Sequence, residues 1–299
     1  MGLGHFVVWG KLLKFVVLIL RKNLQMKNIV TRALSGLVYV ALSVGAILLG
    51  KYAFWGLVAL LCVLAVPEFQ HVLRGPATTR WRKAIVAIDC AVCVAMATIP
   101  ALAGASLDVA IGCSIFVFMY TIIRFTLALY DKEKDAFSDC ARSALTVMYI
   151  GLPMAALSFL YNDNLDNWQL VLAMFAMIWL NDTGAYCVGS MLGKHRLFER
   201  LSPKKSWEGF WGGFAFCLLA GWGCHWLMPD MFSLIGWLGF GAMVSVFSTW
   251  GDLFESLLKR SHAVKDSGHL IPGHGGILDR IDSLLFVAPM SLLFFILFN

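Results

Sequence analysis

The sequence predicts an all-α, polytopic integral membrane protein with about nine transmembrane helices and a cytoplasmic N-terminus. Of its 299 residues, 60% are hydrophobic and 14% are charged, which is far too apolar for a water-soluble domain. Apolar stretches recur along the chain, each about as long as the ~20 residues that a helix needs to cross a bilayer. These stretches are expected to be helices, because in lipid each backbone must satisfy its own hydrogen bonds.

Nine apolar stretches define the expected helices. They run through residues 33–49, 52–68, 84–103, 107–128, 142–160, 168–191, 207–228, 232–250 and 283–298. Up to about residue 160 they are rich in Val, Ala and Leu, and their connections are short. Three polar clusters fall in the second half of the chain, so the chemistry of the protein is expected there.

The N-terminal residues 1–25 are interpreted as an extension of the main domain. Their apolar stretch is interrupted by Lys11 and Lys14, so an interfacial amphipathic helix is expected rather than a tenth span or a cleaved signal peptide. Residues 26–32 look like a natural start of the first span, and Met26 is a candidate translation start. Residues 26–299 then form a single transmembrane domain.

The basic residues predict the orientation. Counted with Arg142 at the edge of one segment, 22 of the 24 Lys and Arg residues fall in five segments that share one side of the membrane: 1–32, 69–83, 129–141, 192–206 and 251–282. The positive-inside rule makes that side cytoplasmic and places the C-terminus outside. The net charge of +6 therefore suits anionic headgroups or anionic soluble substrates at the cytoplasmic face, and nothing points to nucleic acid.

The densest polar stretch stands between the last two apolar stretches, where a membrane protein must line water or hold charged ligands. On a helix, Asp252, Glu255 and Lys259 lie at i, i+3 and i+7 and share one face. Asp279 and Asp282 repeat the i, i+3 spacing on the next helix. Carboxylates from two helices at one boundary can share a hard cation such as Mg²⁺. Ion pairs with the neighbouring Lys and Arg side chains are the alternative.

Two further clusters suit phosphate groups. Residues 272–276 form a turn with three glycines, whose backbone N–H groups can approach an anion closely. Residues 202–206 place two lysines and two serines before a helix that is expected to begin near Trp207. A helix N-terminus with adjacent lysines favours phosphate by dipole and by charge. Lysines that only mark the cytoplasmic side are the alternative.

Two isolated carboxylates also bear on the site. Asp182 lies inside an expected membrane helix, where its charge costs several kcal/mol unless it is hydrated or paired, so it is expected to face a polar cavity. Glu68 stands at a predicted cytoplasmic helix end from which it could reach the same site. An ordinary role at the end of that helix is its alternative.

These clusters also resemble a known family. The 27 residues from Ser256 to Asp282 read S-x-L-K-R-x4-K-D-x-G-x2-I-P-G-H-G-G-I-x-D-R-I-D, which resembles the signature of the phosphatidate cytidylyltransferases, also called CDP-diacylglycerol synthases. Residues 182–186 and 202–209 look like upstream motifs of that family. The resemblance covers about residues 170–299 closely and the earlier spans in general layout.

The resemblance implies a reaction that joins CTP and phosphatidic acid into CDP-diacylglycerol and pyrophosphate, a step of phospholipid biosynthesis. It implies Mg²⁺, with one or two ions at the site. One substrate is soluble and the other lies among the membrane lipids, so the site is expected to be basic, cytoplasmic and open to the bilayer. Such a protein is expected in the cytoplasmic (inner) membrane, with its multi-pass domain 26–299 as the catalytic domain.

The resemblance also assigns expected roles to individual residues. The expected metal ligands are Asp252 and Asp279, with Asp282 and Glu255 as further ligands or their partners. The residues expected to act in the reaction are Asp252, Asp279, Asp282, Lys204 and Lys205. The residues expected to bind substrate are Ser202, Lys259, Arg260, Lys265, His274, Gly275, Gly276, Arg280 and Asp182.

Two other functions fit part of the pattern. A CTP-dependent polyisoprenol or lipid kinase would share the metal and triphosphate chemistry but would release CDP instead of pyrophosphate. A transporter would need charges along a path through the bilayer, whereas the charges here gather on one side. Glycine-rich helices such as 207–223 suit a homodimer interface, and they equally suit packing within one chain.

Overall fold

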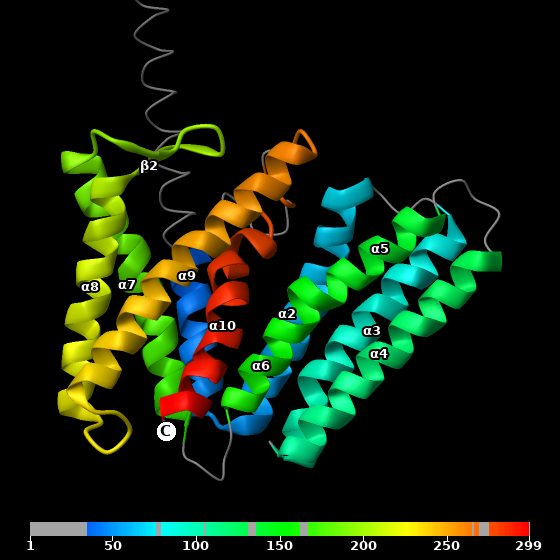
Figure 1. The fold of residues 1–299 in the computed structure, drawn as a ribbon, viewed down its shortest axis with the longest axis horizontal. Coiled ribbons are helices and arrows are strands. Elements are labelled where there is room, and N and C mark those ends of the chain that lie inside the picture. Colours follow the sequence, from blue (N-terminus) through cyan, green and yellow to red (C-terminus); the bar gives the residue numbers. More distant parts are fainter. Residues whose placement is uncertain are drawn as a thin grey trace, which may run out of the picture.

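The computed structural model describes residues 35–75, 79–104, 106–130, 136–161, 167–264, 266–268 and 275–298. The expected N-terminal extension and its interfacial helix lie outside these residues, as do the candidate start Met26 and the candidate substrate-binding residues Lys265 and His274. The described chain consists of helices and one short hairpin, as Figure 1 shows. This composition confirms the predicted all-α, polytopic membrane class.

The elements follow the expected order. A first helix, Ser35–Leu48, precedes α2 (Lys51–Arg74), α3 (Arg80–Ala103), α4 (Leu107–Tyr130), α5 (Ala136–Thr146), the π-helical turn η1 (Val147–Gly151), α6 (Leu152–Leu160), α7 (Trp168–Leu192), β1 (Arg196–Phe198), β2 (Ser202–Ser206), α8 (Trp207–Leu227), α9 (Leu234–Ser261) and α10 (Leu278–Phe298). The strands pair antiparallel, with Arg196 opposite Ser206. The sequence does not predict this hairpin, because so short a lysine-rich segment shows no alternating apolar pattern.

Each of the nine predicted stretches falls on a helix, but not every helix has the character of a full span. Within the described ranges, seven helices are long and apolar enough to cross a membrane. The helix Ser35–Leu48 is shorter than these, and α8 is long but rich in glycine and tryptophan. The coarser prediction of a multi-pass membrane protein is therefore confirmed, while the count of nine spans and the orientation stay predictions.

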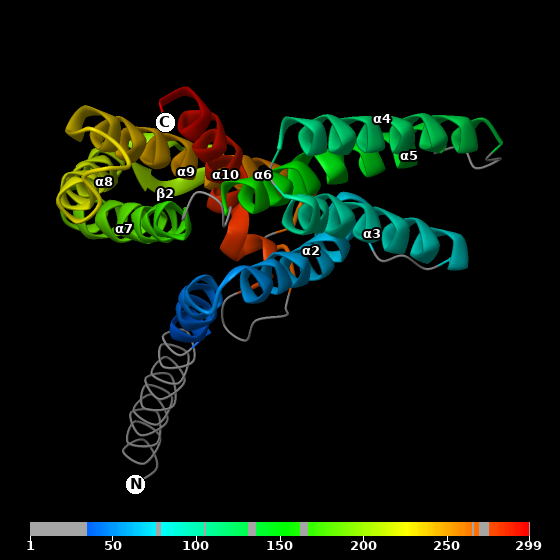
Figure 2. The ribbon, with the colours of Figure 1, turned by 90° about the horizontal axis from the view of Figure 1, so that it is seen from below.

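The helices form two groups that meet along α6 and α10 (Figures 1 and 2). One group contains α2 to α6, and the other contains α7 to α10 with the β1–β2 hairpin at one end. The helices α9 and α10 extend beyond the apolar stretches that predict them. The last turns of α9 and the first turn of α10 belong to the polar stretch 252–282. Asp252, Glu255, Asp279 and Asp282 are therefore helical, whereas Asp266 lies between the two helices.

Small residues bring α7, α8 and α9 close together. A Cβ atom added at Gly213 of α8 would lie 2.6 Å from Oδ1 of Asn181 on α7 and 2.7 Å from its carbonyl oxygen. Asn181 is buried, and its Oδ1 accepts a hydrogen bond of 2.7 Å from Ser245 Oγ on α9. Most glycines of α8 thus pack within the chain, so they give no support to the predicted homodimer, which stays a prediction.

We expect Gly213→Ala to lower the melting temperature of the detergent-solubilised protein, because the added methyl group meets backbone and side-chain atoms of Asn181. Overpacking of this kind costs about 1–3 kcal/mol. Gly223→Ala is the matched control on the same helix, because open space surrounds Gly223 and alanine favours helix by up to ~1 kcal/mol. Equal melting temperatures for the two variants would contradict the close packing of α7 on α8.

Candidate functional site

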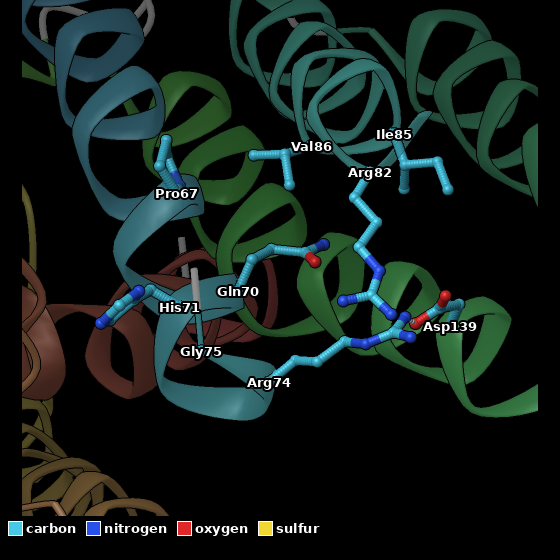
Figure 3. Close-up of a pocket in the computed structure, with 9 residues that line it drawn as sticks. All are labelled: Pro67, Gln70, His71, Arg74, Gly75, Arg82, Ile85, Val86 and Asp139. Atoms are coloured by element: carbon cyan, nitrogen blue, oxygen red, sulfur yellow. Dashed lines mark ion pairs between the residues drawn. The ribbon is translucent and has the colours of Figure 1, made fainter. Parts of the chain in front are cut away.

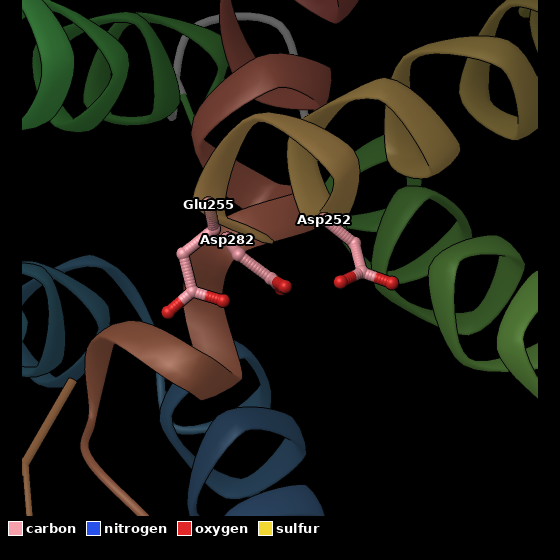
Figure 4. Close-up of side chains that lie close together, drawn as sticks. All are labelled: Asp252, Glu255 and Asp282. Atoms are coloured by element: carbon pink, nitrogen blue, oxygen red, sulfur yellow. The ribbon is translucent and has the colours of Figure 1, made fainter. Parts of the chain in front are cut away.

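Three carboxylates meet where α9 packs against α10. Asp252 and Glu255 come from α9 and Asp282 comes from α10, and one oxygen from each lies within 4.8 Å of the others (Figure 4). Glu255 is only 1% exposed. Its Oε1 is buried without a hydrogen-bond partner among the residues that the structure describes. A buried acceptor of this kind can accept a contact from a cation or from a hydrogen-bond donor.

The close approach of α9 and α10 depends on a glycine. A Cβ atom added at Gly251 would lie 2.5 Å from the carbonyl oxygen of Asp282 and 3.0 Å from the Cα of Ser283. Ser283 Oγ donates a hydrogen bond of 3.1 Å to the carbonyl oxygen of Ser248, which ties the same turns together. Because Gly251 directly precedes Asp252, the contact that joins the helices also fixes the carboxylate cluster.

Lys259 is the cation that partly balances the cluster. Its Nζ lies 2.7 Å from Glu255 Oε2 and 2.6 Å from Asp279 Oδ1, so it bridges α9 and α10. The predicted helical face of Asp252, Glu255 and Lys259 is therefore present, and Lys259 turns toward carboxylates rather than toward an open anion pocket. The ion-pair alternative raised from the sequence holds for this lysine.

Asp279 is not one of the three converging carboxylates, although Lys259 bridges it to Glu255. One of its oxygens pairs with Lys259, and the other accepts hydrogen bonds from Ser267 N at 3.2 Å, Ser267 Oγ at 3.0 Å and Gly276 N at 2.8 Å. Gly275 takes a φ of +84°, a backbone conformation that favours glycine. Asp279 thus joins Ser267 to Gly276, and both its oxygens are engaged.

Glu68 of α2 holds the same segment from the other side. Its Oε2 accepts a hydrogen bond of 3.0 Å from Leu278 N, the first residue of α10, and a longer one of 3.4 Å from Ser267 Oγ. A side chain at Gly268 or Gly276 would collide with the Glu68 carboxylate. The structure therefore brings Glu68 to the site. The sequence analysis allowed this position, with an ordinary role at the end of the helix as its alternative.

A cavity of about 660 Å³ opens beside the carboxylate cluster. The sequence-predicted residues that line it come from α7, the hairpin and α9: Asp182, Ser202, Lys204, Lys205 and Asp252. Lys205 forms an ion pair with Asp252, so the lysine-rich strand β2 is joined directly to the cluster. The expectation that Asp182 faces a polar cavity agrees with this lining.

The hairpin is fixed to the start of α8 by Glu208 and Ser206. The Glu208 carboxylate accepts hydrogen bonds from the backbone N–H groups of Lys194 and His195 and lies 2.6 Å from His195 Nδ1.

Ser206 Oγ accepts a hydrogen bond of 3.1 Å from Gly209 N and caps the helix. The helix begins at Trp207, where the sequence predicts it. These contacts hold Lys204 and Lys205 at the cavity.

The remaining predicted residues occupy different positions. Arg260 is exposed at the end of α9, and Arg280 is half-buried in the first turn of α10. Ser267 is a contributor that the sequence did not single out, because it stands at a position that the motif leaves open. Arg196 also lines the cavity. Strand pairing brings it there, and the sequence does not predict the strands.

Comparison with known proteins places the chain in a family. The model of a family described as the cytidylyltransferase family matches residues 30–298, which is most of the chain. The chain belongs to the cytidylyltransferase family. The match includes α2 and its Glu68 as well as the second helix group, so both groups belong to the family's domain.

Curated relatives of the chain carry the name phosphatidate cytidylyltransferase. The protein of Staphylococcus aureus (strain COL) is 38% identical over 180 residues, which are 60% of this chain and 65% of the relative. Those of Staphylococcus haemolyticus and Staphylococcus epidermidis (strain ATCC 12228) are 36% and 37% identical over 185 residues, covering 59% and 60% of this chain and 66% and 65% of the relatives. The aligned part thus spans just under two thirds of each relative.

We expect Glu68→Gln to destabilise the segment before α10, because a neutral amide accepts the N–H of Leu278 less strongly than a carboxylate does. Hydrogen bonds to charged groups contribute about 1.5–3 kcal/mol, so the melting temperature and the rate of turnover should both fall. Glu199→Gln, at an exposed position in the turn of the hairpin, is the control. A Glu68→Gln protein as stable and active as this control would remove Glu68 from the site.

Proposed function

We propose that this chain transfers the cytidylyl group of CTP to phosphatidic acid and releases CDP-diacylglycerol and pyrophosphate. One observation carries the proposal. The ion pair of Lys205 with Asp252 connects the carboxylate cluster to the lysine-lined cavity. Membership of the cytidylyltransferase family supports the transferred group. The names of the relatives support phosphatidic acid as the acceptor.

The carboxylate cluster fits a divalent cation such as Mg²⁺. Its oxygens are hard ligands, and the buried Oε1 of Glu255 lacks a partner within the described residues. Asp252, Glu255 and Asp282 would hold the ion, and when bound it would offset the negative charge of the triphosphate. The contacts of Asp279 favour a positioning role for that residue. The alternative is that its carboxylate would hold a second metal ion.

The reaction needs two anions to meet. An oxygen of the phosphatidic acid phosphate forms a bond to the α-phosphorus of CTP, while the bond from that phosphorus to the bridging oxygen breaks. Pyrophosphate leaves with the electron pair, and the protein forms no covalent intermediate. Lys204 and Lys205 in the cavity would bind the phosphates and lower their mutual repulsion. Ser202 and Asp182 would line the same space as polar contacts.

The orientation of the site follows from the distribution of charge. The hairpin, the end of α9 and the start of α10 lie at one end of the bundle (Figure 1). The positive-inside rule makes this end cytoplasmic, where CTP is available. The protein would then act as a multi-pass enzyme of the cytoplasmic membrane in phospholipid biosynthesis. A CTP-dependent lipid kinase is not favoured, since the family and its relatives transfer a cytidylyl group.

The decisive assay uses purified protein in detergent with phosphatidic acid, Mg²⁺ and CTP labelled at the α-phosphate. We expect the label to enter the lipid with one pyrophosphate released per lipid, and EDTA to stop the reaction. Label that stays soluble as CDP while the γ-phosphate reaches a lipid would establish the kinase instead.

We expect Asp252→Asn to lower turnover by at least about 100-fold while the protein still folds, because it removes a charge from the cluster and from the Lys205 pair. Asp230→Asn, in the exposed connection before α9, is the matched control. Near-normal turnover of Asp252→Asn would exclude Asp252 from the reaction.

The orientation is tested with enzyme fusions to the C-terminus of the full chain. With nine spans and a cytoplasmic N-terminus, alkaline phosphatase fused after residue 299 should be active, because it folds outside the cytoplasm. A fluorescent protein that folds only in the cytoplasm should be dark at the same position. The opposite pair of results would contradict the predicted number of crossings or the predicted orientation.

A further inference from the structure

Tyr149 brings a hydroxyl from the α2–α6 group to the carboxylate cluster. It lies in the π-helical turn η1 between α5 and α6, where the N–H of Leu152 donates to the carbonyl oxygen of Val147. Single π-helical turns inside α-helices occur frequently at functional sites. The sequence does not single out Tyr149, because it stands within an apolar stretch that is expected to be an ordinary helix.

Aromatic side chains from three helices pack around the ring of Tyr149. Its centroid lies 5.0 Å from that of Phe69 on α2, 5.2 Å from that of Phe254 on α9 and 6.4 Å from that of Phe286 on α10. The same three helices carry Glu68 and the carboxylate cluster. The ring is therefore fixed at the junction of the two helix groups, by the helices that form the site.

The hydroxyl of Tyr149 is buried beside the cluster. The residue is 7% exposed, and its hydroxyl oxygen has no hydrogen-bond partner in the described part of the chain. It interacts electrostatically with all three carboxylates, those of Asp252, Glu255 and Asp282. A phenylalanine would fill the same apolar space without burying an unpaired hydroxyl, which costs free energy. Such a hydroxyl can hydrogen-bond a water molecule or a bound group.

Two buried polar atoms at the cluster thus lack partners among the described residues, the hydroxyl of Tyr149 and Oε1 of Glu255. They come from different helix groups. Mg²⁺ usually keeps several water molecules when carboxylates bind it. Those waters are polarised and donate hydrogen bonds strongly, and a tyrosine hydroxyl can accept one. Oε1 of Glu255 would then bind the ion, and the hydroxyl of Tyr149 would bind one of its waters.

The lining of the larger cavity favours a role of Tyr149 toward the cation rather than toward a substrate. Asp252 lines that cavity, whereas Glu255, Asp282 and Tyr149 do not. A substrate bound among the lysines of the cavity would therefore meet the cluster at Asp252. The hydroxyl of Tyr149 is left to the waters of the cation itself.

We propose that Tyr149 is a positioning residue for the cation, and that its hydroxyl accepts a hydrogen bond from a water molecule that the cation holds. This inference rests on the proposed function, because it requires the cation site of Asp252, Glu255 and Asp282. The hydroxyl fixes the orientation of that water, and the ion is bound more tightly as a result. The cation site then depends on both helix groups, since η1 supplies a contact that α9 and α10 do not.

Tyr120 offers a matched comparison in the same helix group. It is also buried, but its hydroxyl donates to Asp89, which accepts further hydrogen bonds from Ser143 Oγ at 2.9 Å and from Gln70 Nε2. Gln70 lines a smaller cavity of about 280 Å³, to which no residue of the cluster contributes (Figure 3). The protein itself satisfies the Tyr120 hydroxyl, so its removal should lower stability and leave cation binding unchanged.

The test measures binding of Mn²⁺ to the full-length protein in detergent by electron paramagnetic resonance, with no substrate present. Mn²⁺ replaces Mg²⁺ because both prefer six oxygen ligands. We expect Tyr149→Phe to weaken Mn²⁺ binding about tenfold, the effect of removing a group that orients a metal ligand. Tyr120→Phe should bind Mn²⁺ like the wild type, and Asp252→Asn should lose it, which assigns the signal to the cluster. Because no substrate is present, the comparison stays decisive even if the assay above finds no CDP-diacylglycerol.

Melting temperatures give the second readout. In EDTA, Tyr149→Phe should melt at or above the temperature of the wild type, because it removes a hydroxyl without a partner, whereas Tyr120→Phe should melt lower. Mg²⁺ should then stabilise the wild type more than Tyr149→Phe.

Three outcomes would overturn the proposal. Unchanged Mn²⁺ affinity of Tyr149→Phe would remove the residue from the cation site. A lower melting temperature of Tyr149→Phe in EDTA would assign the hydroxyl a structural role instead. A raised KM for CTP with unchanged Mn²⁺ affinity would make Tyr149 a substrate contact.

Discussion

The packing of α9 against α10 at Gly251 forces Asp252, Glu255 and Asp282 into close proximity in a largely buried place. Like charges in a medium of low dielectric repel strongly, so nearby cations or bound protons must offset part of this charge. The protein supplies two such cations, Lys259 from within α9 and Lys205 from the hairpin. Oε1 of Glu255 has no hydrogen-bond partner among the described residues, so it is left as an acceptor beside these lysines. The proposed cation site is therefore a consequence of the helix packing itself.

The second group of contacts orients that cluster. Asp279 accepts hydrogen bonds from the backbone of both Ser267 and Gly276, while Lys259 connects it to Glu255. Glu208 attaches the hairpin to α8 and so sets the position of Lys205 beside Asp252. The carboxylates of this end of the molecule therefore have different tasks. Some face one another across the two helices, and others fix the segments that carry the lysines.

Sequence reasoning succeeds where one helix determines the geometry. The spacing of Asp252, Glu255 and Lys259 predicts a shared face, and Ser206 before Trp207 predicts the start of a helix; the structure has both. It is less informative where segments distant in the sequence meet. Glu68 precedes its partner Leu278 by 210 positions, so no local pattern links them. Nor does the spacing of Asp279 and Asp282 reveal that only Asp282 turns toward the cluster, because that depends on how α10 is rotated against α9.

The hydrogen bond of Glu68 with Leu278 N joins the two helix groups at the level of the cluster, since α2 belongs to one group and α10 to the other. The proposed active site is accordingly not confined to one helix group. A fragment beginning at α7 would retain every carboxylate of the cluster and every lysine of the hairpin, yet it would lack the acceptor that holds the entrance of α10. The smallest unit capable of the proposed chemistry would thus include α2, although α2 contributes no residue to the cluster.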